Sequence, residues 1–150
     1  MIAVRRANRD DLAFIVDAQI AMAAESEGAE LDRATLTQGV RAVLEDRAHA
    51  DYWLAEEDEA PVGMLMTVTE WSDWRNGTVL WIHSVYVMPE ARRRGVYSTL
   101  YEHLRAQVER SDELVGLRLY VDKGNEPAQR TYEALGMTRD HYHLYEWLKP

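Results

Sequence analysis

The sequence of 150 residues contains no cysteine. That absence excludes a disulfide framework, a zinc site built on thiolates and a cysteine nucleophile. No apolar run approaches the length that is needed to cross a bilayer, and the first residues lack the apolar core of a secretory signal. We therefore expect a cytoplasmic protein without a membrane partner.

Positive charge is also scarce. Lysine and arginine number 17 against 26 aspartates and glutamates, which gives a formal net charge of −9 and a pI of about 5.0. Such an acidic chain is poorly suited to bind nucleic acid or an anionic membrane, so neither is expected as a partner. The apolar content of 47 % and the charged content of 29 % are typical of a soluble globular protein, and the length suits one domain, 1–150.

The positive charge is concentrated in one triplet, Arg92 to Arg94, which Gly95 follows. The apolar run 82–87 before it predicts a buried strand, and apolar residues recur at helical spacing from Val96 onward. The first turn of a helix favours an anion because its N–H groups lack helical acceptors and its dipole end is positive. An isolated triplet is as well explained by solvated arginines at a turn, but glycine between a strand and a helix favours a phosphate site.

Two segments carry a family resemblance. Residues 92–97, Arg-Arg-Arg-Gly-Val-Tyr, resemble the acyl-CoA-binding motif Gln/Arg-x-x-Gly-x-Gly/Ala of GCN5-related N-acetyltransferases, the GNAT superfamily. Tyr97 stands where that motif has a small residue. Residues 125–137 are similar to the family's Asn-x-x-Ala-x-x-x-Tyr-x-x-x-Gly-Phe segment, with Met137 in place of phenylalanine. The segments follow each other in the family's order, and the resemblance covers the whole chain.

The resemblance implies the GNAT fold: an α/β fold with a mixed, mostly antiparallel central sheet and helices on both faces. The hydrophobic patterns predict the same order of elements, namely strand, two helices, three strands, helix, strand, helix and strand. The expected strands are 2–6, 52–56, 62–71, 78–88, 117–121 and 142–147. The expected helices begin after Asp10 or Asp11, after Asp32, at Val96 and after Asn125, since each aspartate or asparagine can cap a helix.

The resemblance also implies the cofactor site. Acetyl-CoA is the expected co-substrate, and its pantetheine arm is expected in a gap between the strands that end near Val87 and Val121. Val85, Tyr86 and Val87 are expected to make main-chain contacts with the pantetheine arm. The pyrophosphate is expected at the basic turn and the helix start, with Arg92, Arg93, Arg94, Gly95, Val96, Tyr97 and Ser98 as its neighbours. Asn125 and Tyr132 complete the set of cofactor-binding residues.

The reaction that the resemblance implies is attack by an amine on the thioester of acetyl-CoA. A backbone N–H near Val87 is expected to stabilise the oxyanion of the tetrahedral intermediate. Tyr132 matches the family's general acid, and a phenol with a pKa near 10 holds a proton at neutral pH for the departing thiolate. The alternative for Tyr132 is a packing residue on a helix face; the match of Asn125 favours the acid.

The resemblance names no single residue as the general base. The candidates therefore follow from the predicted pairing of two neighbouring strands. A two-residue turn at Asn76 and Gly77 would pair Arg75 with Thr78 and place Glu70 opposite His83. Such a pair could accept a proton from an ammonium substrate. A strand pair that only stabilises the sheet, or a bulge that shifts the register, is the alternative. If neither residue is the base, a water held by main-chain carbonyls is the remaining candidate.

Three further groups of residues have two interpretations each. Trp71, Trp74 and Trp81 either wall a site for a flat or cationic amine or cover the sheet. The glutamates 25, 27 and 30 interrupt a helical pattern and form either a solvated loop or part of an acceptor pocket. His141 and His143 share a strand face, but no other ligand is clustered with them, so no metal is expected.

The sequence predicts transfer of an acetyl group to a primary amine of a small molecule or peptide, by direct attack on the thioester. The alternative is a non-catalytic module that binds or senses acyl-CoA. Tyr132 and Asn125 favour the enzyme, and Tyr97 favours the alternative. The acceptor amine, the base, acyl chains other than acetyl and the oligomeric state are left open, a homodimer being possible.

Overall fold

A computed structural model describes residues 1–139 and 141–150. The chain divides into two compact units, 1–120 and 121–150. A single domain over 1–150 therefore stays a prediction. In the described part, no helix is both long and apolar enough to cross a membrane.

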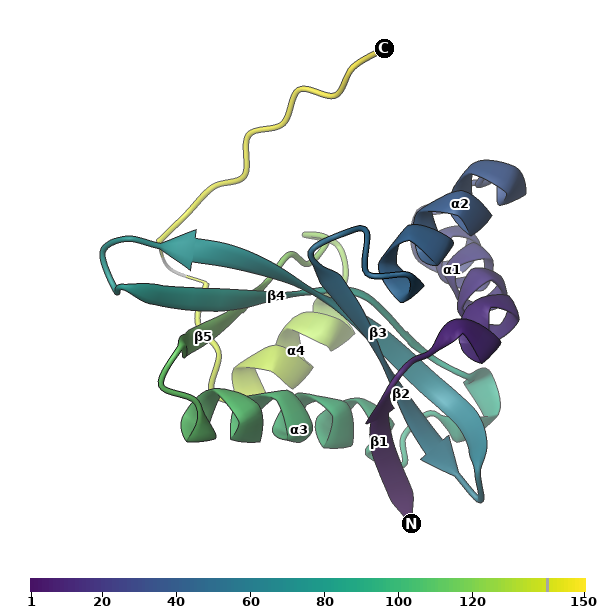
Figure 1. The fold of residues 1–150 in the computed structure, drawn as a ribbon, viewed down its shortest axis with the longest axis horizontal. Coiled ribbons are helices and arrows are strands. Elements are labelled where there is room, and N and C mark those ends of the chain that lie inside the picture. The colour runs from purple at the N-terminus through teal and green to yellow at the C-terminus, as the bar shows by residue number, and fades with distance from the viewer. Residues whose placement is uncertain (140) are drawn as a thin grey trace. The chain divides into compact units, whose positions relative to one another are not determined.

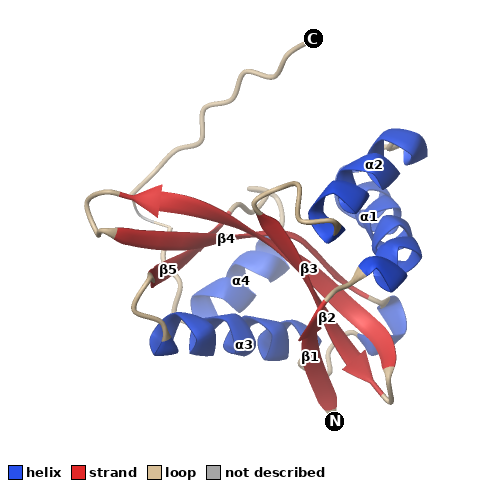
Figure 2. Cartoon of the chain, in the orientation of Figure 1, coloured by secondary structure: helices blue, strands red, loops and turns tan. Residues whose placement is uncertain are grey.

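The first unit is built on a five-stranded sheet, drawn in red in Figure 2. Its strands lie in chain order, with the first four antiparallel and the fifth parallel to the fourth. The strands are β1 (Ile2–Arg6), β2 (Ala50–Glu57), β3 (Ala60–Ser72), β4 (Gly77–Val87) and β5 (Leu114–Leu119). This mixed, mostly antiparallel sheet confirms the predicted fold class.

Helices cover both faces of the sheet (Figure 1). α1 (Leu12–Glu27) and α2 (Arg33–Leu44) lie on one face, and α3 (Val96–Arg110) lies on the other. Alternation along β2 separates the two faces: Tyr52 and Leu54 join the core with α1 and α2, whereas Trp53 packs against His103 of α3, with the rings tilted and their centroids 5.3 Å apart. The core under α1 and α2 contains Ile15, Val16, Ala18, Val40, Val43, Tyr52, Leu54, Met64 and Tyr86.

The helix ends agree with the sequence in part. Asp32 caps α2 as predicted, since its carboxylate accepts the Thr35 N–H at 2.9 Å. Asp11 holds the N-cap position of α1, as predicted, but its side chain makes no capping hydrogen bond to that helix in the described part. The side-chain cap lies one element earlier, at Asn8. Its side chain caps the short 3-10 helix η1 (Arg9–Asp11) that leads into α1, and the Asp11 carboxylate accepts the Asn8 N–H in return.

The connection between β3 and β4 is longer than predicted. Ser72 is opposite Gly77, so the turn comprises the four residues between them, and Asn76 alone adopts a positive φ of 47°. Glu70 consequently lies opposite Val79, and His83 lies opposite Met66. The predicted opposition of Glu70 and His83 is wrong.

A glycine allows α3 to approach the sheet. Gly63 of β3 is buried, and a Cβ atom there would lie 2.8 Å from Cγ1 of Val96 and 3.2 Å from the Tyr86 carbonyl oxygen. We expect Gly63→Ala to lower the free energy of unfolding by about 1–3 kcal/mol, because α3 or β4 must move. Urea denaturation measures this.

The matched control is Gly39→Ala in α2. No atom lies within 4 Å of the added Cβ, so replacing a helical glycine should stabilise the protein by about 1 kcal/mol. Equal effects of the two substitutions would contradict the close approach at Gly63.

In its described residues, 121–139 and 141–150, the second unit contains one helix, α4 (Glu126–Ala134). Asn125 caps it as predicted, its Oδ1 accepting the Ala128 N–H at 3.2 Å, and Gly136 after its end has a φ of 90°. The predicted strand at 142–147 is wrong for this chain by itself, because residues 141–150 form no strand. An alternating pattern makes a strand only when a neighbouring backbone accepts its hydrogen bonds.

Candidate active site

The sheet opens between β4 and β5. Their last paired residues are Ile82 and Leu119, whereas β4 continues to Val87. Just past Ile82, the register with β3 moves from Met66 opposite His83 to Met64 opposite Tyr86, so Ser84 and Val85 together face one residue.

This insertion is a β-bulge, and Ser84 has the left-handed φ of 56°. A bulge bends a strand and increases its local twist, which explains why β4 leaves β5 here. Residues 83–87 therefore have backbone positions without β5 pairing in the described part. Val85, Tyr86 and Val87, the residues to which the resemblance assigns the pantetheine arm, lie in this segment.

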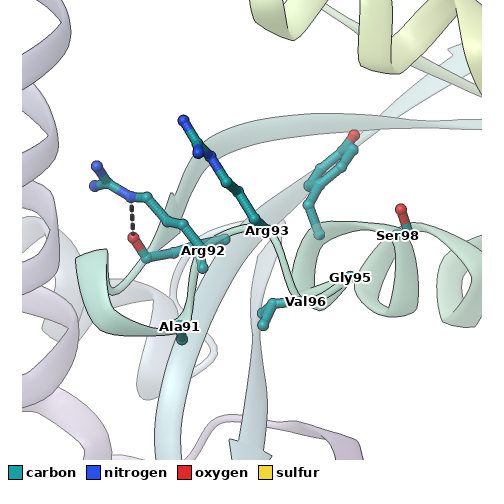
Figure 3. A pocket seen from close by; sticks show the side chains of 8 residues that line it. Ala91, Arg92, Arg93, Gly95, Val96 and Ser98 are labelled. Carbon is teal, nitrogen blue, oxygen red and sulfur yellow. Dashed lines mark hydrogen bonds between the residues drawn. The ribbon is translucent and has the colours of Figure 1, made fainter.

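A pocket of about 180 Å³ lies where β4 leads into α3. Figure 3 shows it from close by. Arg93 and Gly95 both have left-handed φ, 64° and 78°, which turns the chain tightly into the helix. The pocket is lined by Val87, Ala91, Arg92, Arg93, Gly95, Val96, Tyr97 and Ser98.

The helix end at this pocket is suited to an anion. Among the residues that the structure describes, no side chain caps α3, and the Thr99 N–H is bonded to the Gly95 carbonyl at 3.0 Å as the helix begins. A Cβ atom added at Gly95 would meet no atom within 4 Å, so the space beside its backbone is open. Uncapped first-turn amides, a positive dipole end and open space together fit a phosphate group.

The three arginines of the turn have different surroundings. Arg92 donates to Glu25 at 2.7 Å and to the Val87 carbonyl at 3.0 Å. Arg94 is paired with Glu57 at 3.0 Å. For Arg93, no hydrogen bond or ion pair is recorded with any residue of 1–139 or 141–150, and its guanidinium stands beside the pocket in Figure 3. Arg93 is thus the least compensated positive charge at the site.

Glu25 joins α1 to this turn. Its carboxylate also accepts the Tyr86 hydroxyl at 3.2 Å, and Arg92 lies over the Tyr86 ring, 5.4 Å from its centroid. Burial and the charge of Glu25 raise the pKa of Tyr86. The predicted loop at 25–30 is thus partly helix: α1 extends to Glu27 and ends at Gly28.

Three aromatic rings gather on β4 and just past β5. Tyr120 lies with its ring centroid 4.6 Å from Trp81 and 5.7 Å from His83, and Trp81 stacks on His83 at 6.2 Å. Tyr120 was not among the site residues predicted from the sequence, although the resemblance pointed to the end of this strand. Trp71 and Trp74 are exposed, and no ring contact is recorded for either in the described part.

His83 has a distinct electrostatic setting. It is the first β4 residue beyond the last pair with β5, and it is half-buried. Burial lowers the pKa of its imidazole, which favours the neutral form at neutral pH. Glu70 does not counter this, since it lies elsewhere in the register and its carboxylate accepts Arg118 Nη1 at 2.7 Å.

Asn125 and Tyr132 belong to the second unit. Asn125 uses its side-chain oxygen to cap α4, and Tyr132 is a half-buried residue of that helix. Burial raises the pKa of the Tyr132 phenol, which therefore keeps its proton at neutral pH. Among the described residues, no group of three or more potential ligands could hold a metal ion.

The sequence profile described as "Acetyltransferase (GNAT) family" matches residues 18–137. None of the proteins with curated descriptions is similar enough in sequence to match.

Solved structures give closer comparisons. A possible acetyltransferase from Clostridium difficile 630 is 41 % identical with a TM-score of 0.93, over 100 % of this chain and 99 % of that one. A predicted acetyltransferase from Clostridium acetobutylicum, solved with acetyl-CoA, is 20 % identical with a TM-score of 0.72, over 100 % and 96 %. An aminoglycoside acetyltransferase from a soil metagenomic sample, in complex with sisomicin, is 18 % identical with a TM-score of 0.74, over 99 % and 97 %. The last two share the fold.

Proposed function

Because the chain belongs to the GNAT acetyltransferase family, we propose that it transfers an acetyl group from acetyl-CoA to a primary amine of a small molecule or peptide. The observation that carries this proposal is the opening of β4 from β5 at the Ser84 bulge, which continues into the pocket at the start of α3. Unpaired backbone along β4 can bind an extended thioester arm, and the helix end can bind its phosphates.

The residues present fit the cofactor. Open space at Gly95, the uncapped start of α3 and the cation of Arg93 can hold the pyrophosphate. Tyr97 replaces a small residue of the motif, but its ring packs along the helix toward Tyr101, with centroids 6.4 Å apart. Acetyl-CoA would supply the reactive thioester, while residues 85–87 orient it and a backbone N–H near Val87 stabilises the oxyanion.

The amine acceptor is proposed to bind beside the aromatic rings of Trp81 and Tyr120. Aromatic faces attract cations, and a chain with a net charge of −9 favours the approach of a cationic amine. The neighbour solved with sisomicin is an aminoglycoside acetyltransferase, so polyamino sugars are among the acceptors to test. His83, neutral and next to these rings, is the proposed base.

Thiol release tests the proposal. Free CoA is measured as acetyl-CoA is incubated with aminoglycosides, polyamines, amino acids and peptides, and mass spectrometry identifies the acetylated product. We expect amine-dependent thiol release with at least one cationic acceptor. Tight binding of acetyl-CoA with no release for any amine would support the alternative, an acyl-CoA sensor.

Tyr132→Phe tests the proposed general acid. We expect turnover to fall about tenfold with little change in the Michaelis constant for acetyl-CoA, because the proton is needed in the transition state. The effect is modest because a thiolate is a weaker base than an alkoxide or an amide anion and leaves more readily than either. Single-turnover kinetics measure the chemical step.

Tyr101→Phe is the matched control. The pKa of Tyr101 is likewise raised by burial, yet Tyr101 lies in α3 outside the pocket. Equal losses of rate in the two variants would contradict an acid role for Tyr132.

A further inference from the structure

The last ten residues, 141–150, form a segment that we call the arm. Its side chains alternate as in a strand: Tyr142, Leu144, Glu146 and Leu148 make one row, and His141, His143, Tyr145 and Trp147 make the other. Large apolar groups in both rows are typical of a strand that is covered on both faces. In this chain by itself the arm forms no strand.

The apolar side chains of the arm are exposed to an unusual degree. Tyr145 is 91 % exposed and Trp147 is 83 % exposed. The other large exposed groups are Tyr142, Leu144 and Leu148. So much exposed apolar surface on one short segment indicates a binding surface, since scattered single residues are the norm on a monomer.

The strand β5 offers the complementary surface. It pairs with β4 on one side, and no strand of the described residues pairs with its other edge. Its sequence, LVGLRL, contains neither proline nor lysine, and its one cation, Arg118, is paired with Glu70. Natural edge strands are commonly protected by such residues, so this edge is open to pairing.

We propose that the arm adds to the free edge of β5 in a second copy of this chain, as an antiparallel sixth strand. Antiparallel pairing with Leu144 opposite Leu117 also places Tyr142 opposite Leu119. It sets Tyr145 over Gly116, where an added Cβ would meet no atom within 4 Å. Apolar side chains of the arm then face apolar side chains of β5.

Charge supports the pairing of the arm with β5. In the same register, Lys149 at the end of the arm comes beside Asp112 and Glu113, which precede β5. Parallel pairing with Leu144 opposite Leu117 would bring Arg139 beside Asp112 instead, so charge is matched in either direction and the disulfide test below decides between them.

Exchange of arms between two copies covers both the exposed side chains of the arm and the free edge of β5. Each copy supplies one arm and one β5 edge, so a twofold dimer covers both arms and leaves neither edge exposed. This inference concerns assembly and does not depend on the proposed acetyl transfer.

Disulfide trapping tests the pairing directly, because the chain has no cysteine of its own. Single variants Gly116→Cys and Tyr145→Cys are mixed, exchanged by unfolding and refolding together, and oxidised. Directly opposed residues have Cβ atoms about 5 Å apart, so we expect a disulfide that joins the two variants. Leu144→Cys is the matched control: it lies on the other face of the strand and should not couple to Gly116→Cys.

The double variant Gly116→Cys/Tyr145→Cys separates exchange from pairing within one chain. Exchange gives a product of twice the chain mass on a non-reducing gel. A product of single-chain mass, or equal coupling of Leu144→Cys and Tyr145→Cys, would overturn the proposal.

Light scattering supplies a second measurement. We expect the unmodified protein to be a dimer and Leu144→Pro/Tyr145→Pro to be a monomer. Neighbouring residues of a strand direct their N–H groups to opposite sides, so one of the two prolines must remove a hydrogen bond to β5. Trp74→Asp removes an equally exposed aromatic ring at the hairpin and should remain a dimer. A monomeric unmodified protein, or a dimeric double-proline variant, would overturn the proposal.

Discussion

Gly95→Asp is expected to weaken CoA binding by about 100-fold or more, as measured by isothermal titration calorimetry. Two effects combine. A non-glycine residue at a φ of 78° costs about 1–2 kcal/mol in the left-handed region. The new carboxylate also occupies the open space at the start of α3, where it repels a phosphate and accepts the N–H groups that would bind it.

Gly28→Asp is the matched control. Gly28 has a φ of 59° and no atom within 4 Å of an added Cβ, but it ends α1 and does not line the pocket. The same substitution there imposes similar backbone strain and the same charge. CoA affinity should remain close to that of the unmodified protein, whereas equal losses in both variants would show that the phosphate turn is misassigned.

Added salt separates the charge contribution from the shape of the turn. We expect CoA affinity to fall with ionic strength, because Arg93 and the helix end act through screened charges. The Arg93→Ala variant should show a weaker dependence on salt than Arg92→Ala, since Arg92 is already paired with Glu25.

The phosphate turn was predictable because its signals are local. A basic triplet, a glycine and the start of a helical pattern lie within a few residues, and the structure places them around one pocket. The partners of the arginines were not predictable in the same way. Glu25 lies 67 residues from Arg92, and Glu57 lies 37 residues from Arg94. Only the folded chain determines which carboxylates reach them.

The hairpin shows why local signals can mislead. Asn76 adopts the positive φ that an Asn-Gly pair suggests, yet Gly77 belongs to β4. The pairing of thirteen-residue β3 with β4 decides the register, and side-chain packing along both strands outweighs the preference of one turn. The bulge at Ser84 then shifts the register again, and no glycine marks it in the sequence.

The arm failed as a predicted strand for a related reason. Its alternation is a property of the sequence, but a strand also requires a backbone partner. The segment 141–150 has the alternating pattern, but in the chain by itself it has no backbone partner and forms no strand. The exchange proposed above supplies that partner.

His83→Ala is expected to lower turnover about 100-fold near neutral pH, because a positioned base contributes at least that much to proton transfer. Burial lowers the pKa of His83 below its ordinary value of about 6.5, so the imidazole is already neutral at pH 7 and can accept the proton of an ammonium substrate. In the unmodified enzyme, turnover over the Michaelis constant should therefore rise with pH below neutrality and level off as His83 loses its proton.

The pH profile of His83→Ala should differ in shape as well as in height. Without the imidazole the substrate must lose its proton to solvent, so the rate should keep rising through alkaline pH, and the deficit should shrink as free amine accumulates. His103→Ala is the matched control, since burial likewise lowers the pKa of His103 but its ring packs against Trp53 on the opposite face of the sheet. His103→Ala should keep the acidic limb of the pH profile, which is the rise of turnover over the Michaelis constant below neutral pH in the unmodified enzyme. If His83→Ala keeps that limb and a near-full rate, the base is not His83, and a water held by main-chain carbonyls takes its place.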